Sequence, residues 1–314
     1  MSKPQGLAWP QLPYEQWRDT CSTLQLWTQI VGKIRLRQTP WLNHSWHVTL
    51  YVTARGLTTS PIPYGARSFE MRFDFIAHSL NIDVTDGTHR EIPLRPQSVA
   101  DFYSAVTRSL AELGIPLAIE ELPCEIAGAI PFSQDRTHAA YDAEYAHRFW
   151  LTLVQCDRLM KQFRTGFIGK CSPVHFFWGS FDLAVTRFSG RTAPVFSGKT
   201  PGVAAAVMRE AYSHEVSSAG FWPGGNGIDY PAFYSYAYPV PADFRKYPVR
   251  PAEAFFSDAL GEFLLPYDAL RAAADPDAAL LEFLQSTYEA AAESAHWDRK
   301  ALERAIGVPG VCPN

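Results

Sequence analysis

Apolar residues recur at three- and four-residue spacings in four stretches of the chain, and this pattern predicts amphipathic helices. The first helix should cover residues 14–31 and end at Gly32, before a short extended piece. A second should begin after Ser98, a candidate N-cap. The longest should span residues 138–166. Near the C-terminus, Asp275 is a candidate N-cap, and the proline that follows it suits a first helical turn.

Alternating apolar and polar residues predict strands between these helices. Residues 46–53 should form one strand, and residues 69–87 one long strand or two short ones ended by Asp86 and Gly87. Residues 115–126 have a further strand pattern, and three aromatic-rich segments follow between residues 171 and 238. Because the strands cluster rather than alternate strictly with helices, we predict an α+β fold of mostly antiparallel strands, with the helices packed on one side of the sheet.

A short internal echo bears on the domain organisation. LYVTARG resembles LAVTRFSG, and each is followed by a connector and then a strand with a central histidine, His78 in one half and His214 in the other. We expect a single domain over residues 1–314. If the echo is a duplication, that domain contains two similar β-rich lobes, at about 14–125 and 170–270, joined by the long helix and closed by the C-terminal helix. Duplication and chance similarity both stay open.

Composition narrows the class of protein. The 314 residues are 47% hydrophobic and 14% aromatic, enough for a sizeable core, and a net charge of −4 without a basic cluster argues against nucleic-acid binding. No apolar run is long enough for a membrane span, and the first residues lack a signal-peptide pattern, so we expect a cytoplasmic protein. Five scattered cysteines without a CxxC pair fit neither a disulfide framework nor a thiolate zinc site.

The apolar run PVHFFWGSFDLAV carries two polar residues, His175 and Asp182. A strand through this run would place the two side chains on opposite faces. An ionised aspartate among apolar residues is costly unless it is paired, and Arg187, Arg191 or Arg209 could supply the partner. Asp182 is then either half of a structural ion pair or a carboxylate that faces a ligand.

The segment REAYSHEVSSAG carries Glu210, His214 and Glu215. In a helix, Glu210 and His214 would lie one turn apart, a suitable spacing for two metal ligands. The serines and glycine that follow favour a strand instead, in which case a divalent metal would need further ligands such as His175 or His47. A metal ligand, a proton-transfer group and a hydrogen-bonded core residue all stay open for His214.

Aromatic residues around these groups predict a ligand pocket. The candidate catalytic residues are His214, His175, Asp182 and Glu215, the candidate substrate-binding residues are Trp178, Arg187, Trp222, Tyr236 and His47, and the candidate metal ligands are His175, His214 and Glu210. We predict a small-molecule enzyme with hydrolytic or proton-transfer chemistry. The alternative is a non-catalytic binding protein that uses the same pocket. No nucleotide or flavin motif is present, so the cofactor stays open, and so does the oligomeric state.

Several long motifs point to one family. The stretches NHSWHVTLYVTARGL, SPVHFFWGSFDLAVTRFSGR and EAYSHEVSSAGFWPG resemble an uncharacterised bacterial family, domain of unknown function 5996, and the resemblance extends over nearly the whole chain. It implies a single-domain, cytosolic bacterial protein. It brings no activity, cofactor or site residue with it.

Overall fold

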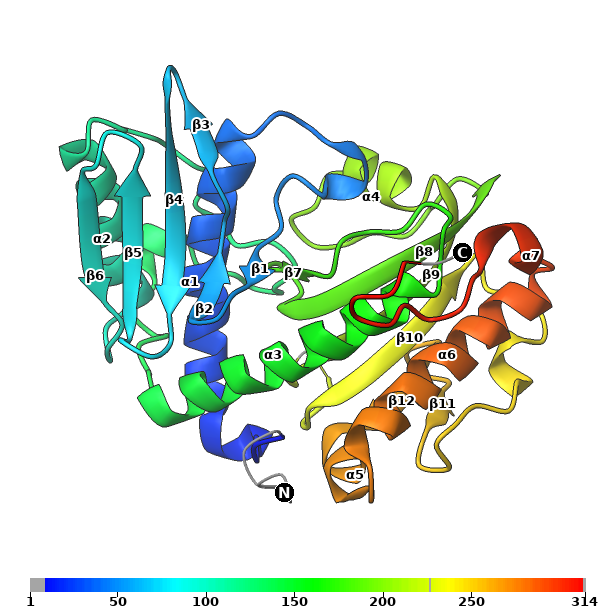
Figure 1. The fold of residues 1–314 in the computed structure, drawn as a ribbon. Helices are drawn as coiled ribbons and strands as arrows, with labels where there is room; N and C mark the ends of the chain where they lie inside the picture. Colours follow the sequence, from blue (N-terminus) through cyan, green and yellow to red (C-terminus); the bar gives the residue numbers. More distant parts are fainter. Residues whose placement is uncertain (1–8, 226, 313–314) are drawn as a thin grey trace.

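A computed structural model describes residues 9–225 and 227–312 as two antiparallel β-sheets with seven α-helices, so the predicted α+β class is confirmed (Figure 1). The strands of the first sheet are β1 (Tyr51–Val52), β2 (Gly56–Thr58), β3 (Ile62–Tyr64), β4 (Arg67–Asp74), β5 (Ser79–Val84) and β6 (His89–Pro93). Those of the second are β7 (His175–Phe177), β8 (Asp182–Thr192), β9 (His214–Trp222), β10 (Ala232–Tyr238), β11 (Phe255–Ser257) and β12 (Glu262–Pro266). The orders are β1-β2-β4-β5-β6, with β3 paired to β4, and β11-β12-β10-β9-β8-β7.

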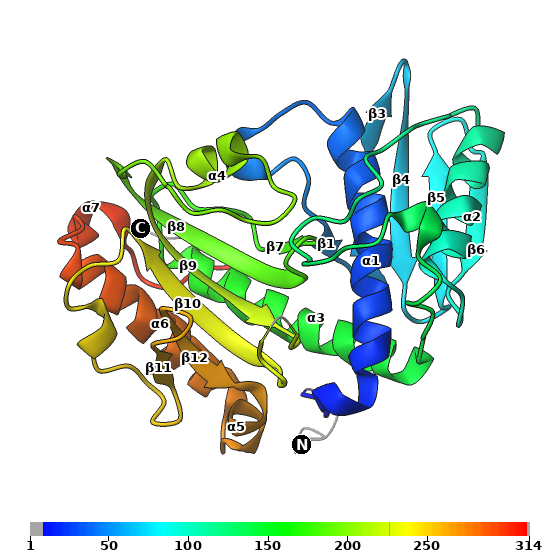
Figure 2. The same cartoon turned by 180° about the vertical axis from the view of Figure 1, so that it is seen from behind.

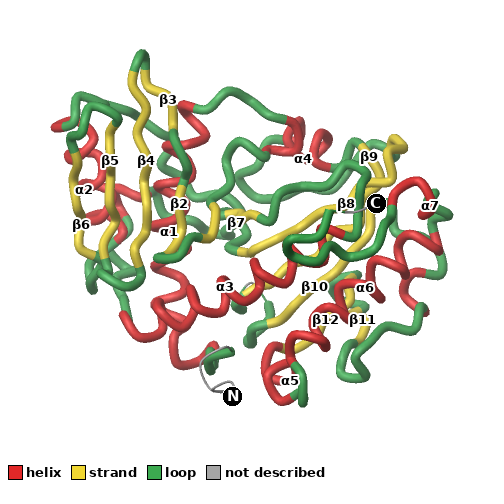
Figure 3. Tube along the Cα trace, in the orientation of Figure 1, coloured by secondary structure: helices red, strands yellow, loops and turns green. Residues whose placement is uncertain are grey.

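Within the described residues, seven α-helices accompany the two sheets. They are α1 (Tyr14–Gln38), α2 (Val99–Glu112), α3 (Ala143–Thr165), α4 (Ala205–Ala211), α5 (Tyr267–Ala272), α6 (Pro276–Ser294) and α7 (Arg299–Leu302), with 3-10 turns η1 (Asn43–Ser45), η2 (Phe132–Gln134) and η3 (Phe244–Lys246). Helices α1 and α2 lie behind the first sheet, whereas α3 and α6 cross the second (Figures 1 and 2). Long loops occupy much of the remaining surface (Figure 3). In the part of the chain described, no helix is long and apolar enough to cross a membrane.

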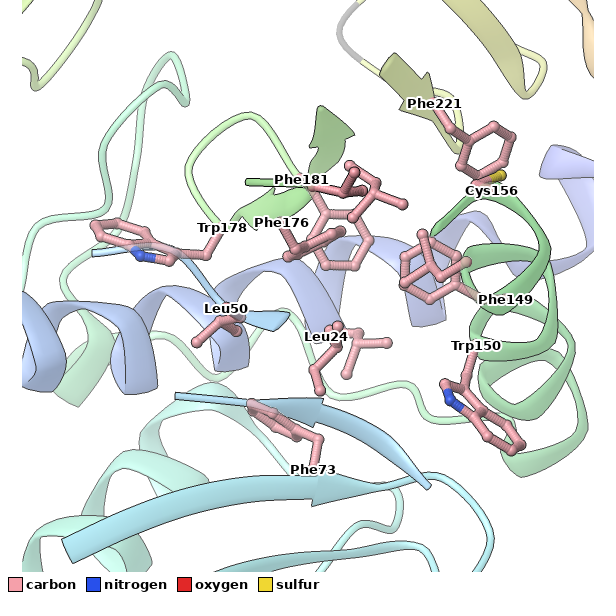
Figure 4. Packing of buried hydrophobic residues seen from close by; sticks show 14 of the residues in the cluster. Leu24, Leu50, Phe73, Phe149, Trp150, Cys156, Phe176, Trp178, Phe181 and Phe221 are labelled. Carbon is pink, nitrogen blue, oxygen red and sulfur yellow. The ribbon is translucent and has the colours of Figure 1, made fainter. Parts of the chain in front are cut away.

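The two sheets meet at a backbone bridge. The Leu50 amide donates to the Phe176 carbonyl at 2.9 Å, and the Phe176 amide donates back to the Leu50 carbonyl at 2.7 Å. Both side chains are fully buried, and the Phe176 ring packs edge-on against Phe149 of α3 and against Phe181 (Figure 4). Buried residues from both sheets therefore form one hydrophobic core.

Helix α1 shows why one predicted boundary was wrong. The helix continues through Gly32 to Gln38, so the predicted extended piece after residue 32 is helical. A Cβ at Gly32 would overlap the indole ring of Trp178, which is fixed because its Nε1 donates to the Val48 carbonyl at 2.8 Å. Gly32 therefore provides room for a close contact and does not end the helix.

Of the other predictions of local structure, the helix N-caps are confirmed, whereas several strand and helix boundaries differ. Both N-caps are confirmed: the Ser98 and Asp275 side chains accept the expected backbone N–H bonds, each at 3.1 Å. The stretch predicted over residues 69–87 contains two strands, β4, which begins at Arg67, and β5, which ends at Val84. Of residues 46–53 only β1 is a strand, because Leu50 pairs with Phe176 instead. Residues 115–126 are irregular and contain two prolines, which cannot donate to a ladder. Helix α3 begins at Ala143 and is shorter than α1.

Candidate functional site: an acidic cluster on the second sheet

The face of the second sheet opposite α3 and α6 carries the polar residues. Tyr234 of β10 pairs with Gly220 of β9 and with Leu264 of β12, and Gly220 pairs with Ala184 of β8. Because side chains alternate along a strand, Asp182 and Glu262 lie on the same face as Tyr234. Figure 2 shows this face from the side that α3 and α6 leave uncovered, with α4 near one end.

Gly220 of β9 leaves room for the Tyr234 side chain of β10 to reach Asp182 of β8. A Cβ at this position would lie 2.5 Å from the Leu183 carbonyl oxygen and would collide with the Tyr234 hydroxyl. Without that Cβ, the Tyr234 side chain crosses β9 and its hydroxyl donates to Oδ2 of Asp182 on β8. The SSAGFW segment thus links two strands that do not pair with each other.

Asp182 is buried and held by hydroxyl groups. The Ser180 hydroxyl donates to its Oδ1 at 2.5 Å, and Tyr234 donates to Oδ2. Burial raises the pKa of the Asp182 carboxyl, and the two hydroxyl bonds act in the lowering direction. No arginine or lysine of the described residues forms an ion pair with Asp182, so the arginine partner expected from the sequence is replaced by two neutral donors.

The negative charge of Asp182 affects the pKa of two glutamates, Glu125 and Glu262. Burial, and then the Asp182 charge, raise the pKa of Glu125 and the pKa of Glu262, each to about 7. Glu125 comes from the loop after α2, where its amide donates to the Pro201 carbonyl at 2.7 Å and its backbone is left-handed, with φ 61°. Glu262 is the first residue of β12. Both side chains are half-buried. Glu125, Asp182 and Glu262, with the tyrosines beside them, are called the acidic cluster below.

Tyrosines complete the acidic cluster. The Tyr212 hydroxyl donates to the Tyr236 hydroxyl at 3.3 Å, and the rings of Tyr234 and Tyr236 are stacked with centroids 6.2 Å apart. Phe196 stacks on Tyr212 at 4.5 Å. Burial raises the pKa of the Tyr212, Tyr234 and Tyr236 phenols, so these groups stay protonated and act as hydrogen-bond donors.

The predicted histidines lie elsewhere. His47, Glu210 and His214 lie around η1 and α4. There Trp41 donates to the Glu210 carboxylate at 2.6 Å, and its ring packs at a tilt against that of His47, with centroids 4.7 Å apart. The His214 ring lies 6.2 Å from that of His44. Across the described residues, no three His, Cys, Asp or Glu side chains are placed to hold a metal ion together. His175, His214 and Glu210, proposed above as metal ligands, are therefore not gathered into one set.

His175 is enclosed in the core. Its ring is fully buried among Trp46, Tyr51 and Phe177, and neither ring nitrogen has a hydrogen-bond partner. Burial, with a smaller contribution from Arg35, lowers the pKa of His175 to about 3. The pairing of Phe177 with Asp182 places His175 and Asp182 on one face, so the prediction of opposite faces was wrong.

Arg187 lies on the opposite, helix-covered face. It is 2% exposed, and its guanidinium carbon sits 3.5 Å from the Phe163 ring centroid and 4.4 Å from that of Tyr288. Its Nη2 donates to the Phe163 carbonyl at 2.5 Å. Burial lowers the pKa of Arg187 to about 10. The structure does not bring this arginine to the acidic cluster.

The remaining predicted residues are dispersed. Trp178 packs on α1, and Glu215 forms an ion pair with Arg191 at 2.7 Å on the helix-covered side. Trp222 ends β9 and is half-buried. Of the nine predicted catalytic and substrate-binding residues, only Asp182 and Tyr236 belong to the acidic cluster.

A cavity of about 380 Å³ lies apart from the acidic cluster, between the β1–β2 turn and α3. Its walls are mainly apolar, and its charged group is Asp157. Lys161 pairs with that carboxylate at 2.6 Å, so the charge is already neutralised. The acidic cluster is therefore the stronger candidate for a functional site.

Sequence reasoning missed Glu125 and Glu262. Glu125 lies in a stretch predicted as a strand, and the stretch GEFLLP mixes helix and strand signals, so that it predicts no single element around Glu262. The signal that was available is the apolar setting of Glu262, which opens a strand beside the tyrosine strand β10.

The fold and the cluster define a two-sheet α+β protein in which one buried carboxylate, Asp182, accepts a hydrogen bond from a tyrosine. The chain belongs to the family of unknown function DUF5996, whose pattern matches residues 9–304. Searches of curated proteins and of solved structures found no match.

Proposed function

We propose that this protein is an enzyme that carries out acid–base chemistry, either hydrolysis or proton transfer, on a small neutral or cationic molecule bound at the acidic cluster. The observation that carries the proposal is the coupling of Glu125 and Glu262 to a single buried carboxylate, Asp182. A carboxylate that raises the pKa of two other carboxyl groups, without an arginine or lysine of the described residues paired to any of the three, is costly to stability, and such arrangements concentrate at functional sites.

The two glutamates suit the two roles that such a reaction needs. With the pKa of each at about 7, either carboxyl can hold or release a proton near neutral pH. One glutamate then donates a proton to a leaving group while the other accepts one from the substrate or from water. Asp182 tunes them: Tyr234 and Ser180 hold its carboxylate in place, and its charge helps burial to keep both pKa values raised.

The charge of the acidic cluster favours a neutral or cationic substrate. No lysine or arginine of the described chain pairs with the three carboxylates, so an anionic substrate would be repelled. Phenol donors and partly ionised carboxylates suit hydroxyl and amine groups, and the Phe196–Tyr212 stack offers an apolar surface beside them. Small polyols, glycosides and amines fit this chemistry.

The test is a chromogenic screen at several pH values. The panel contains neutral nitrophenyl glycosides and esters, cationic aminoacyl nitroanilides and the anionic nitrophenyl phosphate. We expect turnover of a neutral or cationic substrate with a bell-shaped pH profile around neutrality, and a loss of roughly 10²–10⁴-fold in Glu262→Gln and in Glu125→Gln. Glu282→Gln, at an exposed position of α6, is the matched control and should keep full activity.

Other outcomes would overturn the proposal. Turnover of the phosphate alone, or full activity in both glutamine variants, would place the chemistry elsewhere. Stabilisation of the protein by saccharides or polyamines without any turnover would refute the enzyme and favour the non-catalytic binding protein.

A further inference from the structure

A second polar group, independent of the acidic cluster, surrounds Lys170. This lysine follows α3, and its carbonyl accepts from the Phe188 amide at 3.0 Å, which fixes the residue beside β8. Its Nζ lies 2.6 Å from Nε2 of His44, 4.7 Å from the Phe188 ring centroid and 5.6 Å from that of Trp46. The amine is thus held between an imidazole and two aromatic faces while the residue as a whole stays exposed.

The hydrogen bonds of His44 show which partner donates in its contact with Lys170. Nδ1 of His44 lies 3.2 Å from the Ala211 carbonyl, which can only accept, so Nδ1 carries the hydrogen. Nε2 therefore has a free lone pair, and it faces the Lys170 amine. The imidazole is oriented as an acceptor for a lysine proton.

The backbone around His44 is in an unusual conformation. His44 and Ser45 both adopt the left-handed region, with φ of 57° and 59°. Two consecutive non-glycine residues in this region are energetically unfavourable, and such strain gathers at functional sites. The turn brings the nearly buried His44 ring over Phe188, at 4.7 Å between centroids, and so toward Lys170.

The charged groups around Lys170 also support a role for His44 as the acceptor of a proton from this lysine. Burial lowers the pKa of Lys170, and the nearby Glu210 carboxylate acts in the opposite direction. Burial, and then the Lys170 charge, lower the pKa of His44. His214, whose ring lies 6.2 Å from His44, is the other titratable group on this side. A neutral imidazole beside a partly desolvated ammonium group is the arrangement that activates a lysine nucleophile.

We propose that Lys170 is a nucleophilic lysine that forms an imine with a small aldehyde or ketone carrying an apolar or aromatic group. Nε2 of His44 accepts a proton from the ammonium, and the neutral amine adds to the carbonyl carbon. The resulting hydroxyl group takes a proton back from His44 and leaves as water, so that one protonated imine and one water form from one ammonium and one carbonyl. Trp46 and Phe188 provide the wall for the apolar group.

Reductive trapping tests the proposal. The full-length protein is incubated with benzaldehyde and sodium cyanoborohydride at neutral pH, and the labelled lysines are identified by peptide mass spectrometry. Lys161 is the internal control, because it is exposed and held by an aspartate rather than by a histidine. We expect Lys170 to be labelled roughly 10²-fold faster than Lys161, the lower end of what a positioned base contributes.

Two variants make the result specific. His44→Asn removes the ring acceptor but suits the left-handed backbone, and it should reduce labelling at residue 170 to the rate at Lys161. Lys170→Arg should abolish the labelling at this position and leave that of Lys161 unchanged. Equal labelling of Lys170 and Lys161 in the wild type, or undiminished labelling of Lys170 in a His44→Asn protein whose thermal melt matches the wild type, would refute the proposal.

Discussion

Replacing Glu262 by glutamine should stabilise the protein at alkaline pH and leave its stability unchanged at acidic pH. Glutamine keeps the size of the side chain and removes the charge that Asp182 and burial disfavour. The pKa of Glu262 is about 7 in the folded chain, against 4.5 for the unperturbed group. A carboxyl whose pKa is raised by folding binds its proton more tightly in the folded state, so the free energy of unfolding falls as pH rises from 4.5 to 7.

The magnitude follows from the two pKa values. Their difference of about 2.5, at about 1.36 kcal/mol per pKa unit, corresponds to ~3 kcal/mol. Glu262 is only half-buried, so water screens part of this penalty and we expect ~1–2 kcal/mol. The gain in Glu262→Gln should be absent near pH 4, grow between pH 4.5 and 7, and stay constant above pH 8. For a chain of 314 residues it corresponds to a rise in Tm of roughly 1.5–3 °C.

Urea unfolding and thermal melts of the wild type and Glu262→Gln, at pH 4 and pH 8, measure the effect. The other titrating groups are common to both proteins, so the difference between them isolates Glu262 and its coupling to Asp182. Glu282→Gln, the exposed control, should show no pH-dependent difference. A Glu262→Gln protein that is less stable than the wild type at pH 8, or equally stabilised at both pH values, would refute the reasoning.

Two further predictions concern packing. Gly32→Ala gains about 1 kcal/mol of helix propensity but forces a methyl group into the Trp178 ring, so urea unfolding should show a net loss of ~1–2 kcal/mol. That loss should shrink in a Trp178→Phe background; an additive double variant would contradict the contact. Arg187→Ala should lose ~2–4 kcal/mol because it empties a ring-lined site, whereas Arg187→Met should stay within about 1 kcal/mol of the wild type. Equal losses in both arginine variants, by calorimetry, would show that the charge matters more than the packing.

Local signals in the sequence predicted local features well. Ser98 and Asp275 cap helices because their side chains bond to backbone groups three residues away, a relation visible in the sequence itself. The expected end of α1 was wrong because the reason for Gly32 lies in Trp178, almost 150 positions along the chain. A glycine that ends a helix and one that admits a distant ring look the same in one sequence.

The candidate site was predictable only in part, because it too depends on contacts between residues that are distant in the sequence. Asp182 stood out because an ionisable group in an apolar run needs partners, and that reasoning holds. The identity of the partners depends on strand register: Tyr234 reaches Asp182 only because Gly220 lies between them. Glu125 approaches from an irregular loop, which no periodicity describes.

The backbone bridge between Leu50 and Phe176 also bears on self-association. An edge strand normally presents unpaired amide and carbonyl groups to which a strand from another molecule can add. Beside β1 and β7, the edges that face each other within this molecule, the bridge already uses such groups at 2.9 and 2.7 Å. Strand addition at this junction would first have to separate the two sheets and expose the Leu50 and Phe176 side chains to water. Aggregation through strand pairing is therefore directed to the other edge strands, which are β6 and β11 at the far ends of the two sheets and β3, which pairs with β4 alone.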